Sequence, residues 1–171
     1  CMAVSVPVPV GEKVADDLMD RMIPLVENLP VGPPADTNAA MGPVITRQSL
    51  DRITSLLQSG IDKGAKLLVD GRGVKVPGHE NGFFIGASLF DHVTPEMDIY
   101  KEEIFGPVLS VIRVKTFEEA TKLINDHEYG NGVSIYTRDG DSARTFASKI
   151  QVGMVGINVP IPVPMAFHSF G

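Results

Sequence analysis

VLSVIRV, residues 108–114, is followed directly by KTFEEATKLIN, residues 115–125. The first segment is an apolar run rich in β-branched residues, which is typical of a central β-strand. In the second segment, Thr116 and Glu119 have the spacing of a capping box, in which both side chains satisfy backbone N–H groups at the start of a helix. We therefore expect a strand and then a helix that turns three apolar residues inward, Ala120, Leu123 and Ile124.

The same alternation continues towards the end of the chain. Residues 133–137 predict a strand, residues 140–150 a helix and residues 154–159 a further strand. Strands and helices that alternate in this way form βαβ units, whose strands are parallel and joined by right-handed crossovers. We therefore expect an α/β fold built on an open, mostly parallel twisted sheet flanked by helices.

The first residues of the chain predict a strand and a helix. Residues 2–10 are an apolar run that contains Pro7 and Pro9, which suits a short strand near a sheet margin because proline cannot donate to a ladder. Residues 12–28 have apolar positions at helical spacing and predict an amphipathic helix. Pro24 is expected to kink or shorten the last turn of that helix.

A proline-rich connection, residues 29–43, leads to a second helix. Thr46 is expected to cap this helix, which runs to about Lys63, and Gly64 is placed to stop it. Two short strands are then expected, at residues 66–69 and 83–90.

The composition is typical of a soluble globular protein, and 171 residues suffice for a single domain, residues 1–171. A net charge of −6 argues against a nucleic-acid partner or an anionic membrane surface. No run of 18 apolar residues occurs, so no transmembrane helix is expected. The single cysteine cannot form an internal disulfide, which is typical of a reducing compartment.

Few residues could carry chemistry. The one thiol is Cys1, and the four histidines are scattered without the spacing of metal ligands, so no metal site is expected. The sequence contains no P-loop, no G-x-G-x-x-G turn and no serine nucleophile elbow. What remains is KEEIFGPV, residues 101–108. This segment is either a turn with solvated acids, or a loop beside a cleft where an acid binds ligand hydroxyls and the aromatic packs on a ring.

Several segments resemble motifs of the aldehyde dehydrogenase superfamily. EEIFGPV, residues 102–108, looks like the motif of the same sequence in that family. The resemblance covers essentially the whole chain in order, with MGPVI at 41–45, GAKLL at 64–68, YGNG at 129–132, YTRD at 136–139 and SFG at 169–171. Two further segments are similar to the CoA-acylating methylmalonate- and malonate-semialdehyde dehydrogenase branch: CMA at 1–3 and GINVPIPVP at 156–164.

The resemblance implies a cysteine-based oxidation of a semialdehyde. Cys1 would attack the aldehyde carbon to give a thiohemiacetal, and loss of hydride to NAD would leave a thioester. The acyl group would then lose CO₂ and pass to coenzyme A. Glu103 would accept hydrogen bonds from the nicotinamide ribose, and Phe105 would pack beside that ribose and ring. This interpretation requires that Cys1 and the acid–aromatic pair face one crevice.

The resemblance assigns a place to two further residues. Asn158 and Phe170 would lie near the substrate channel. The alternatives are a strand-end turn residue for Asn158 and plain core for Phe170. For Cys1, the alternatives are a residue left over from a cloning or cleavage step and a mobile terminus.

Parts of the family's machinery have no counterpart in these residues. The glycine-rich nucleotide-binding domain, the side-chain amide of the oxyanion hole and the arginines that hold the substrate carboxylate would precede Cys1. We therefore expect a catalytic domain that belongs to a longer chain and that alone neither binds NAD tightly nor oxidises aldehyde. The whole protein is expected to be a homodimer or homotetramer in the cytoplasm, or in the mitochondrial matrix of a eukaryote. Two alternatives stay open: a hydrolytic semialdehyde dehydrogenase, and a non-catalytic domain that acts in subunit assembly.

Overall fold

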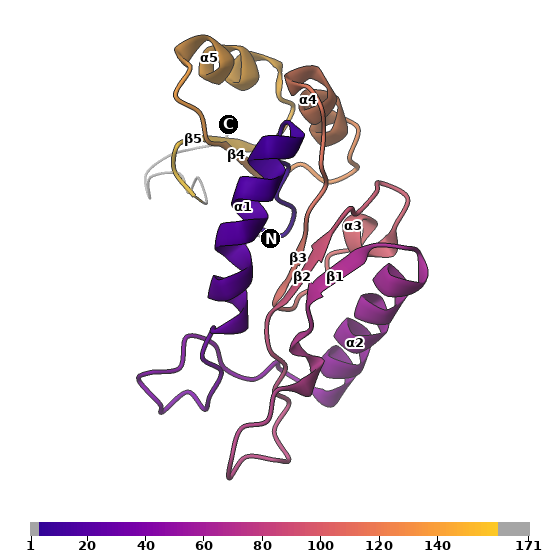
Figure 1. The fold of residues 1–171 in the computed structure, drawn as a ribbon, viewed down its shortest axis with the longest axis vertical. Coiled ribbons are helices and arrows are strands. Elements are labelled where there is room, and N and C mark those ends of the chain that lie inside the picture. The colour runs from indigo at the N-terminus through magenta and orange to yellow at the C-terminus, as the bar shows by residue number, and fades with distance from the viewer. Residues whose placement is uncertain (1–3, 161–171) are drawn as a thin grey trace. The chain divides into compact units, whose positions relative to one another are not determined.

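The computed structural model describes residues 4–160, and Figure 1 shows their helices and strands. The chain divides into two compact units. The larger unit is Ser5–Lys115. The smaller unit contains, among the described residues, Val4 and everything from Thr116 onward. The predicted strand at residues 2–10 begins outside the described part of the chain.

The larger unit is a three-stranded sheet with helices on both faces. Its strands are β1 (Lys66–Val69), β2 (Ser88–Asp91) and β3 (Val108–Ser110), in the order β1-β2-β3. β2 pairs antiparallel with β1 and parallel with β3. The helices are α1 (Glu12–Glu27), α2 (Arg47–Asp62) and the short α3 (Asp98–Lys101), and a 3-10 turn, Gly71–Gly73, follows β1.

The two long helices cover opposite faces of this sheet. Adjacent residues of the buried strand β2 point to opposite sides, so β2 contributes side chains to the packing against both helices. Leu89 belongs to a core cluster with Met19 of α1 and Val111. The next residue, Phe90, lies against Gly60 of α2, where an added Cβ would meet its ring at 3.2 Å. α2 therefore packs closely against the sheet, near the loop that leads into β3.

The capping signals in the sequence position α2 as expected. The Thr46 hydroxyl accepts a hydrogen bond from the Ser49 N–H at 3.0 Å, and the helix gives way after Asp62 to Gly64, whose φ is +94°. α1 is also confirmed, and it continues past Pro24 to Glu27. The expected helices therefore form at the expected places.

Residues 5–9 run beside the end of β3 but form only half of a parallel ladder. The carbonyls of Ser5, Pro7 and Pro9 accept hydrogen bonds from the backbone N–H groups of residues 110, 112 and 114 at 3.0–3.2 Å. In a regular parallel ladder the carbonyls of residues 110 and 112 would accept from residues 7 and 9. Both of those residues are prolines and have no N–H. Only Val10 therefore makes a full bridge, to Val114, and the predicted strand shrinks to that point.

The smaller unit contains one complete βαβ unit. β4 (Gly132–Ile135) and β5 (Met154–Ile157) are parallel, and α5 (Gly140–Lys149) connects them. Helix α4 (Phe117–Asn125) begins at Thr116, whose hydroxyl accepts from the Glu119 N–H at 3.1 Å, as the capping box predicts. Phe117 of α4 and Phe146 of α5 meet edge to face, with ring centroids 6.1 Å apart, so the two helices share a small core.

The α/β fold class is confirmed, and β1 has the expected bounds, but the other four strands are shorter than expected and the strands fall into two sheets. β3 pairs with β2, whereas β4 pairs with β5, so the helix after β3 does not connect strands of one sheet. The expected strand at 83–90 begins only at Ser88 because the preceding backbone packs on the Gly71 turn instead. There the Gly86 N–H donates to the Gly71 carbonyl at 2.8 Å.

No helix in the described part of the chain is long and apolar enough to cross a membrane.

Candidate active-site loop

Residues 102–107 form the loop between α3 and β3, and two anchors hold it against the larger unit. Ile104 is buried, with 7% of its surface exposed. Gly106 lies against α2, where a Cβ would stand 2.6 Å from Ile53 Cδ1, so only glycine allows the loop to approach this closely. These anchors alternate with two exposed residues, Glu103 and Phe105.

Phe105 is held in an unusual conformation. Its φ is +55°, in the left-handed region that non-glycine residues seldom adopt. Its side chain is also among the exposed large hydrophobics, with 74% of the residue surface accessible. A backbone conformation of this kind costs about 1–3 kcal/mol and persists only where the surroundings enforce it.

Arg52 of α2 supplies part of that enforcement. Its Nη1 donates to the Ile104 carbonyl at 2.9 Å, and its Nη2 donates to Glu102 Oε2 at 3.0 Å. Arg52 therefore holds both the backbone of this loop and the Glu102 side chain. The next acid of the motif, Glu103, is exposed, and a carboxylate has about four acceptor sites.

The geometry of this loop suits a ligand that carries hydroxyls next to a flat ring. An exposed carboxylate can accept hydrogen bonds from sugar hydroxyls, and an exposed aromatic ring can pack on another ring. Glu103 and Phe105 lie two positions apart on this loop and both are exposed, and a cleft beside the loop stays a prediction. A ribose with an attached nicotinamide has this combination of groups.

Asn158 lies in the smaller unit, at the end of β5, and its side chain is used structurally. Its Oδ1 accepts from the Thr137 N–H and its Nδ2 donates to the Thr137 carbonyl, both at 2.9 Å. Its own N–H donates to the Ile135 carbonyl at 2.8 Å, and its φ is +56°. These contacts give Asn158 the role of a strand-end turn residue, which the sequence left as an alternative. Its position at a substrate channel stays a prediction.

Cys1 and Phe170 lie outside the described residues. The structure therefore brings together two of the five predicted site residues, Glu103 and Phe105, on one loop of the larger unit. Among the described residues, no group of three or more His, Cys, Asp or Glu side chains is arranged to hold a metal ion.

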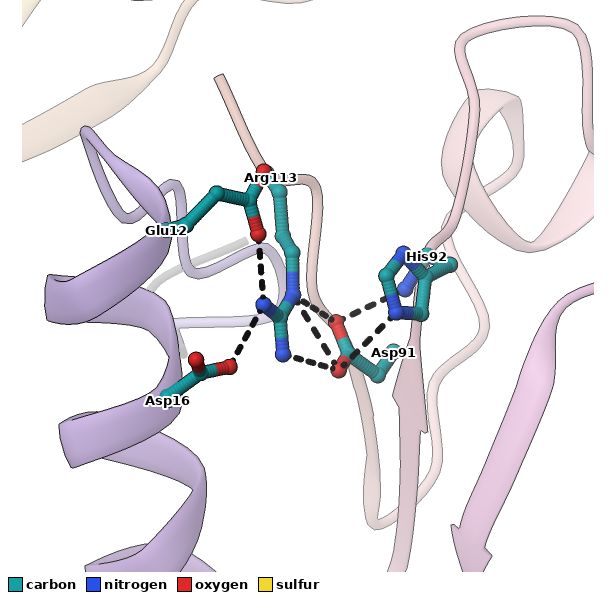
Figure 2. A network of polar contacts seen from close by, with 5 residues as sticks. All are labelled: Glu12, Asp16, Asp91, His92 and Arg113. Atoms are coloured by element: carbon teal, nitrogen blue, oxygen red, sulfur yellow. Dashed lines mark hydrogen bonds and ion pairs between the residues drawn. The ribbon is translucent and has the colours of Figure 1, made fainter. Parts of the chain in front are cut away.

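A partly buried ion network beside the sheet was not anticipated from the sequence (Figure 2). The Arg113 guanidinium binds Asp91 at the end of β2, with Nη2–Oδ2 at 2.7 Å and Nε–Oδ1 at 3.0 Å. Its Nη1 also binds Glu12 at 2.8 Å and Asp16 at 2.7 Å, both on α1. The network therefore joins the start of α1 to the sheet, directly after the half-ladder of residues 5–9.

Burial and pairing act in opposite directions on Asp91. Desolvation on burial raises its pKa, but hydrogen bonds from Arg113 and from the His92 N–H together outweigh this, so the pKa is lowered. The pKa of Arg113 is raised, first by its hydrogen bonds to Asp91 and further by those to Asp16 and Glu12, despite the opposing effect of burial. Both groups are therefore charged near neutral pH. The signal for this pair in the sequence is the one charged residue in the apolar run VLSVIRV.

Comparison with known proteins agrees with the family resemblance and with this fold. The model of the aldehyde dehydrogenase family matches residues 1–171. The chain is 58% identical over 171 residues to malonate-semialdehyde dehydrogenase of Pseudomonas aeruginosa, of which it covers 34%. It is 49% identical over 170 residues to the acylating mitochondrial methylmalonate-semialdehyde dehydrogenase of Arabidopsis thaliana, of which it covers 28%.

A solved structure agrees over the whole chain. A protein of Sinorhizobium meliloti 1021, described as a methylmalonate-semialdehyde dehydrogenase and complexed with NAD, superimposes with a TM-score of 0.98 at 64% identity. The match covers 100% of this chain and 35% of that one. The chain thus spans about a third of the length of these relatives. With the family model matched from its first residue to its last, the chain belongs to the aldehyde dehydrogenase family.

Proposed function

We propose that this chain is the thiol-bearing part of an NAD-dependent, CoA-acylating dehydrogenase of malonate semialdehyde or methylmalonate semialdehyde. The observation that carries the proposal is the 58% identity to a malonate-semialdehyde dehydrogenase over all 171 residues. The CMA segment at 1–3 and the GINVPIPVP segment at 156–164 favour the same branch. Three mammalian relatives and one plant relative, 46–49% identical, carry the word acylating in their names.

In this proposal Cys1 is the nucleophile. Its thiolate attacks the aldehyde carbon and forms a C–S bond, and the carbonyl oxygen takes up a proton to give a thiohemiacetal. The C–H bond of that carbon then breaks with its electron pair, the hydroxyl loses its proton, and a thioester to Cys1 remains. NAD, when bound, supplies the acceptor for the hydride. The acyl group then loses CO₂, and the carbon that carried the carboxylate takes up a proton. Attack by the thiol of coenzyme A on the thioester breaks the bond to Cys1 and releases acetyl-CoA or propionyl-CoA and the free cysteine.

The loop of residues 102–107 contributes binding and orientation. Glu103 accepts hydrogen bonds from the ribose hydroxyls next to the nicotinamide, and Phe105 packs beside the ribose and the ring. Both residues are exposed on a loop that Ile104 and Gly106 hold in place, which supports this assignment. Asn158 and Phe170, both near the substrate channel, are the remaining part of the proposed site.

The proposed whole protein is larger than this chain. We infer that residues 1–171 form one catalytic domain of a longer polypeptide whose preceding part binds most of NAD, because the chain covers only 34–35% of two of its relatives. We also infer a homodimer or homotetramer, in the cytoplasm or in the mitochondrial matrix of a eukaryote. Alone, the chain is expected to lack both tight NAD binding and aldehyde oxidation.

The proposal is tested on the full-length protein with malonate semialdehyde, NAD and coenzyme A. We expect NADH, CO₂ and acetyl-CoA in equal amounts, little turnover without coenzyme A, and loss of turnover but not of NAD binding in Cys1→Ala. Free acid as the product, independent of coenzyme A, would assign the hydrolytic alternative. Absence of NADH formation with either semialdehyde would reject the proposal.

A further inference from the structure

We infer that Arg52 is a positioning residue for the NAD contacts, because it holds the peptide plane that turns Phe105 into its left-handed conformation. The inference deepens the proposed function and rests on it, since it takes Glu103 and Phe105 as the groups that meet NAD. Arg52 itself belongs to α2 and needs no contact with the cofactor for this role.

The first step concerns one peptide group. The Ile104 carbonyl belongs to the peptide that joins Ile104 to Phe105, so the orientation of that plane sets the φ of Phe105. Arg52 Nη1 binds this carbonyl oxygen at 2.9 Å. A hydrogen bond of this length is directional and resists rotation of the plane. It therefore stabilises a φ of +55°, a value that phenylalanine does not favour.

The second step is that the other anchors of the loop cannot replace this bond. Burial of the Ile104 side chain and the contact of Gly106 with Ile53 fix where the loop passes. Neither of these apolar contacts fixes the direction of the Ile104 carbonyl. The guanidinium is itself held, because its Nη2 donates to Glu102 Oε2 at 3.0 Å. The planar fork of arginine serves both acceptors at once, which the single ammonium of lysine cannot do in the same geometry.

The third step connects the plane to both proposed ligand groups. Glu103 and Phe105 flank Ile104, so a rotation of the backbone at Ile104 changes the direction of one side chain relative to the other. Loss of the Arg52 bond should therefore weaken NAD binding while leaving the fold and the thiol chemistry largely intact.

The test uses the full-length protein and the variants Arg52→Lys and Arg52→Gln. We expect the KM for NAD and the Kd for NADH, measured by fluorescence titration, to rise about tenfold. Without Arg52, cofactor binding itself must supply the free energy that restores the strained left-handed conformation of Phe105. The KM for the semialdehyde and the alkylation rate of Cys1 in the free enzyme should stay within about twofold of wild type. Arg72→Lys is the matched control, because Arg72 binds Asp70 and Gln58 in the same unit, away from the loop.

A double-mutant cycle separates positioning from general stability. Glycine adopts positive φ at no steric cost, so in a Phe105→Gly background the plane no longer needs to be held. We expect Phe105→Gly to weaken NAD binding by itself, and Arg52→Lys to add less than about a twofold further loss in that background. A role of Arg52 in stability alone would give the same loss in both backgrounds.

Glu103→Gln, measured in parallel, distinguishes this inference from the proposed function. If Glu103→Gln weakens NAD binding and Arg52→Lys behaves like Arg72→Lys, the inference is overturned and the proposed cofactor loop stands. If Glu103→Gln and Phe105→Gly both leave NAD binding unchanged, the proposed cofactor loop fails and the inference fails with it. An equal effect of Arg52→Lys in both backgrounds also overturns it. Should Arg52→Gln not fold, Arg52→Lys, which keeps the charge, gives the result.

Discussion

Replacing Arg113 by methionine should destabilise the larger unit far more than removing either of its acidic partners on α1. Methionine keeps most of the apolar stem but leaves the Asp91 carboxylate, whose side chain is 3% exposed, without its guanidinium. Breaking a buried pair from one side costs about 3–5 kcal/mol. Glu12 and Asp16 are 69% and 64% exposed, so each of these pairs is worth at most about 1 kcal/mol.

The assay is urea unfolding of the purified chain, followed by circular dichroism, with Glu12→Gln and Asp16→Asn as controls. A loss of 3–5 kcal/mol is a large share of the roughly 5–15 kcal/mol that stabilises a domain, so Arg113→Met should unfold at much lower urea. The double variant Arg113→Met/Asp91→Asn should recover part of this loss, because it removes the unpaired charge and keeps an acceptor for the His92 N–H.

The pH dependence of the difference between Arg113→Met and wild type gives a second, independent check. In wild type the pKa of Asp91 is lowered, so its contribution is present above about pH 4, the unfolded pKa, and is lost as the pH falls through the lower folded pKa. In Arg113→Met, burial raises the pKa instead, so the folded state binds the proton more readily than the unfolded state. Stability of the variant relative to wild type should therefore improve as the pH falls from 7 towards about 5. The reasoning is refuted if Arg113→Met unfolds at the same urea concentration as Glu12→Gln and if its difference in stability from wild type does not depend on pH.

Substitutions at three further positions test contacts described above, each by the thermal unfolding midpoint or by urea unfolding of the chain. Asn158→Ala should cost about 1–3 kcal/mol, because it leaves both backbone groups of Thr137 without their side-chain partners, and Asn158→Asp, which keeps only the acceptor, should fall between it and wild type. Gly71→Ala should prevent stable folding of the larger unit or lower its midpoint severely, since the new Cβ would stand 2.0 Å from the Gly86 carbonyl oxygen; a small shift would contradict the close backbone approach. Thr116→Ala should cost about 1 kcal/mol and Thr116→Ser much less, because only the first removes the helix cap.

Helices and their ends could be predicted from sequence because the signals are local. Thr46 and Thr116 cap the helices that they were expected to cap, and the apolar residues that face inward recur at helical spacing. The acid–aromatic loop could also be singled out, because EEIFGPV is an unusual run for a plain turn.

Strand pairing and the ion network depend on contacts between distant parts of the chain, and local patterns do not encode them. The run VLSVIRV predicts a strand, but nothing within it says that β3 pairs with β2 rather than with β4. Likewise, Arg113 is visible as a charge in an apolar run, whereas its partners Asp91, Glu12 and Asp16 lie 22 to 101 positions away. The contact of Glu102 with Arg52 likewise joins positions that lie 50 residues apart.

The two prolines beside β3 also determine which backbone amides can be used to follow residues 5–9, the segment near Cys1, by hydrogen exchange. Pro7 and Pro9 have no amide hydrogen, so hydrogen exchange cannot follow this segment directly at either position. Its partners can: the amides of Ser110, Ile112 and Val114 are covered only while residues 5–9 stay attached. Because the attachment has about half the hydrogen bonds of a regular parallel edge, it can lift away at a cost below that of unfolding the sheet. These three amides should therefore exchange with solvent sooner than that of Val111, which is bonded to Phe90.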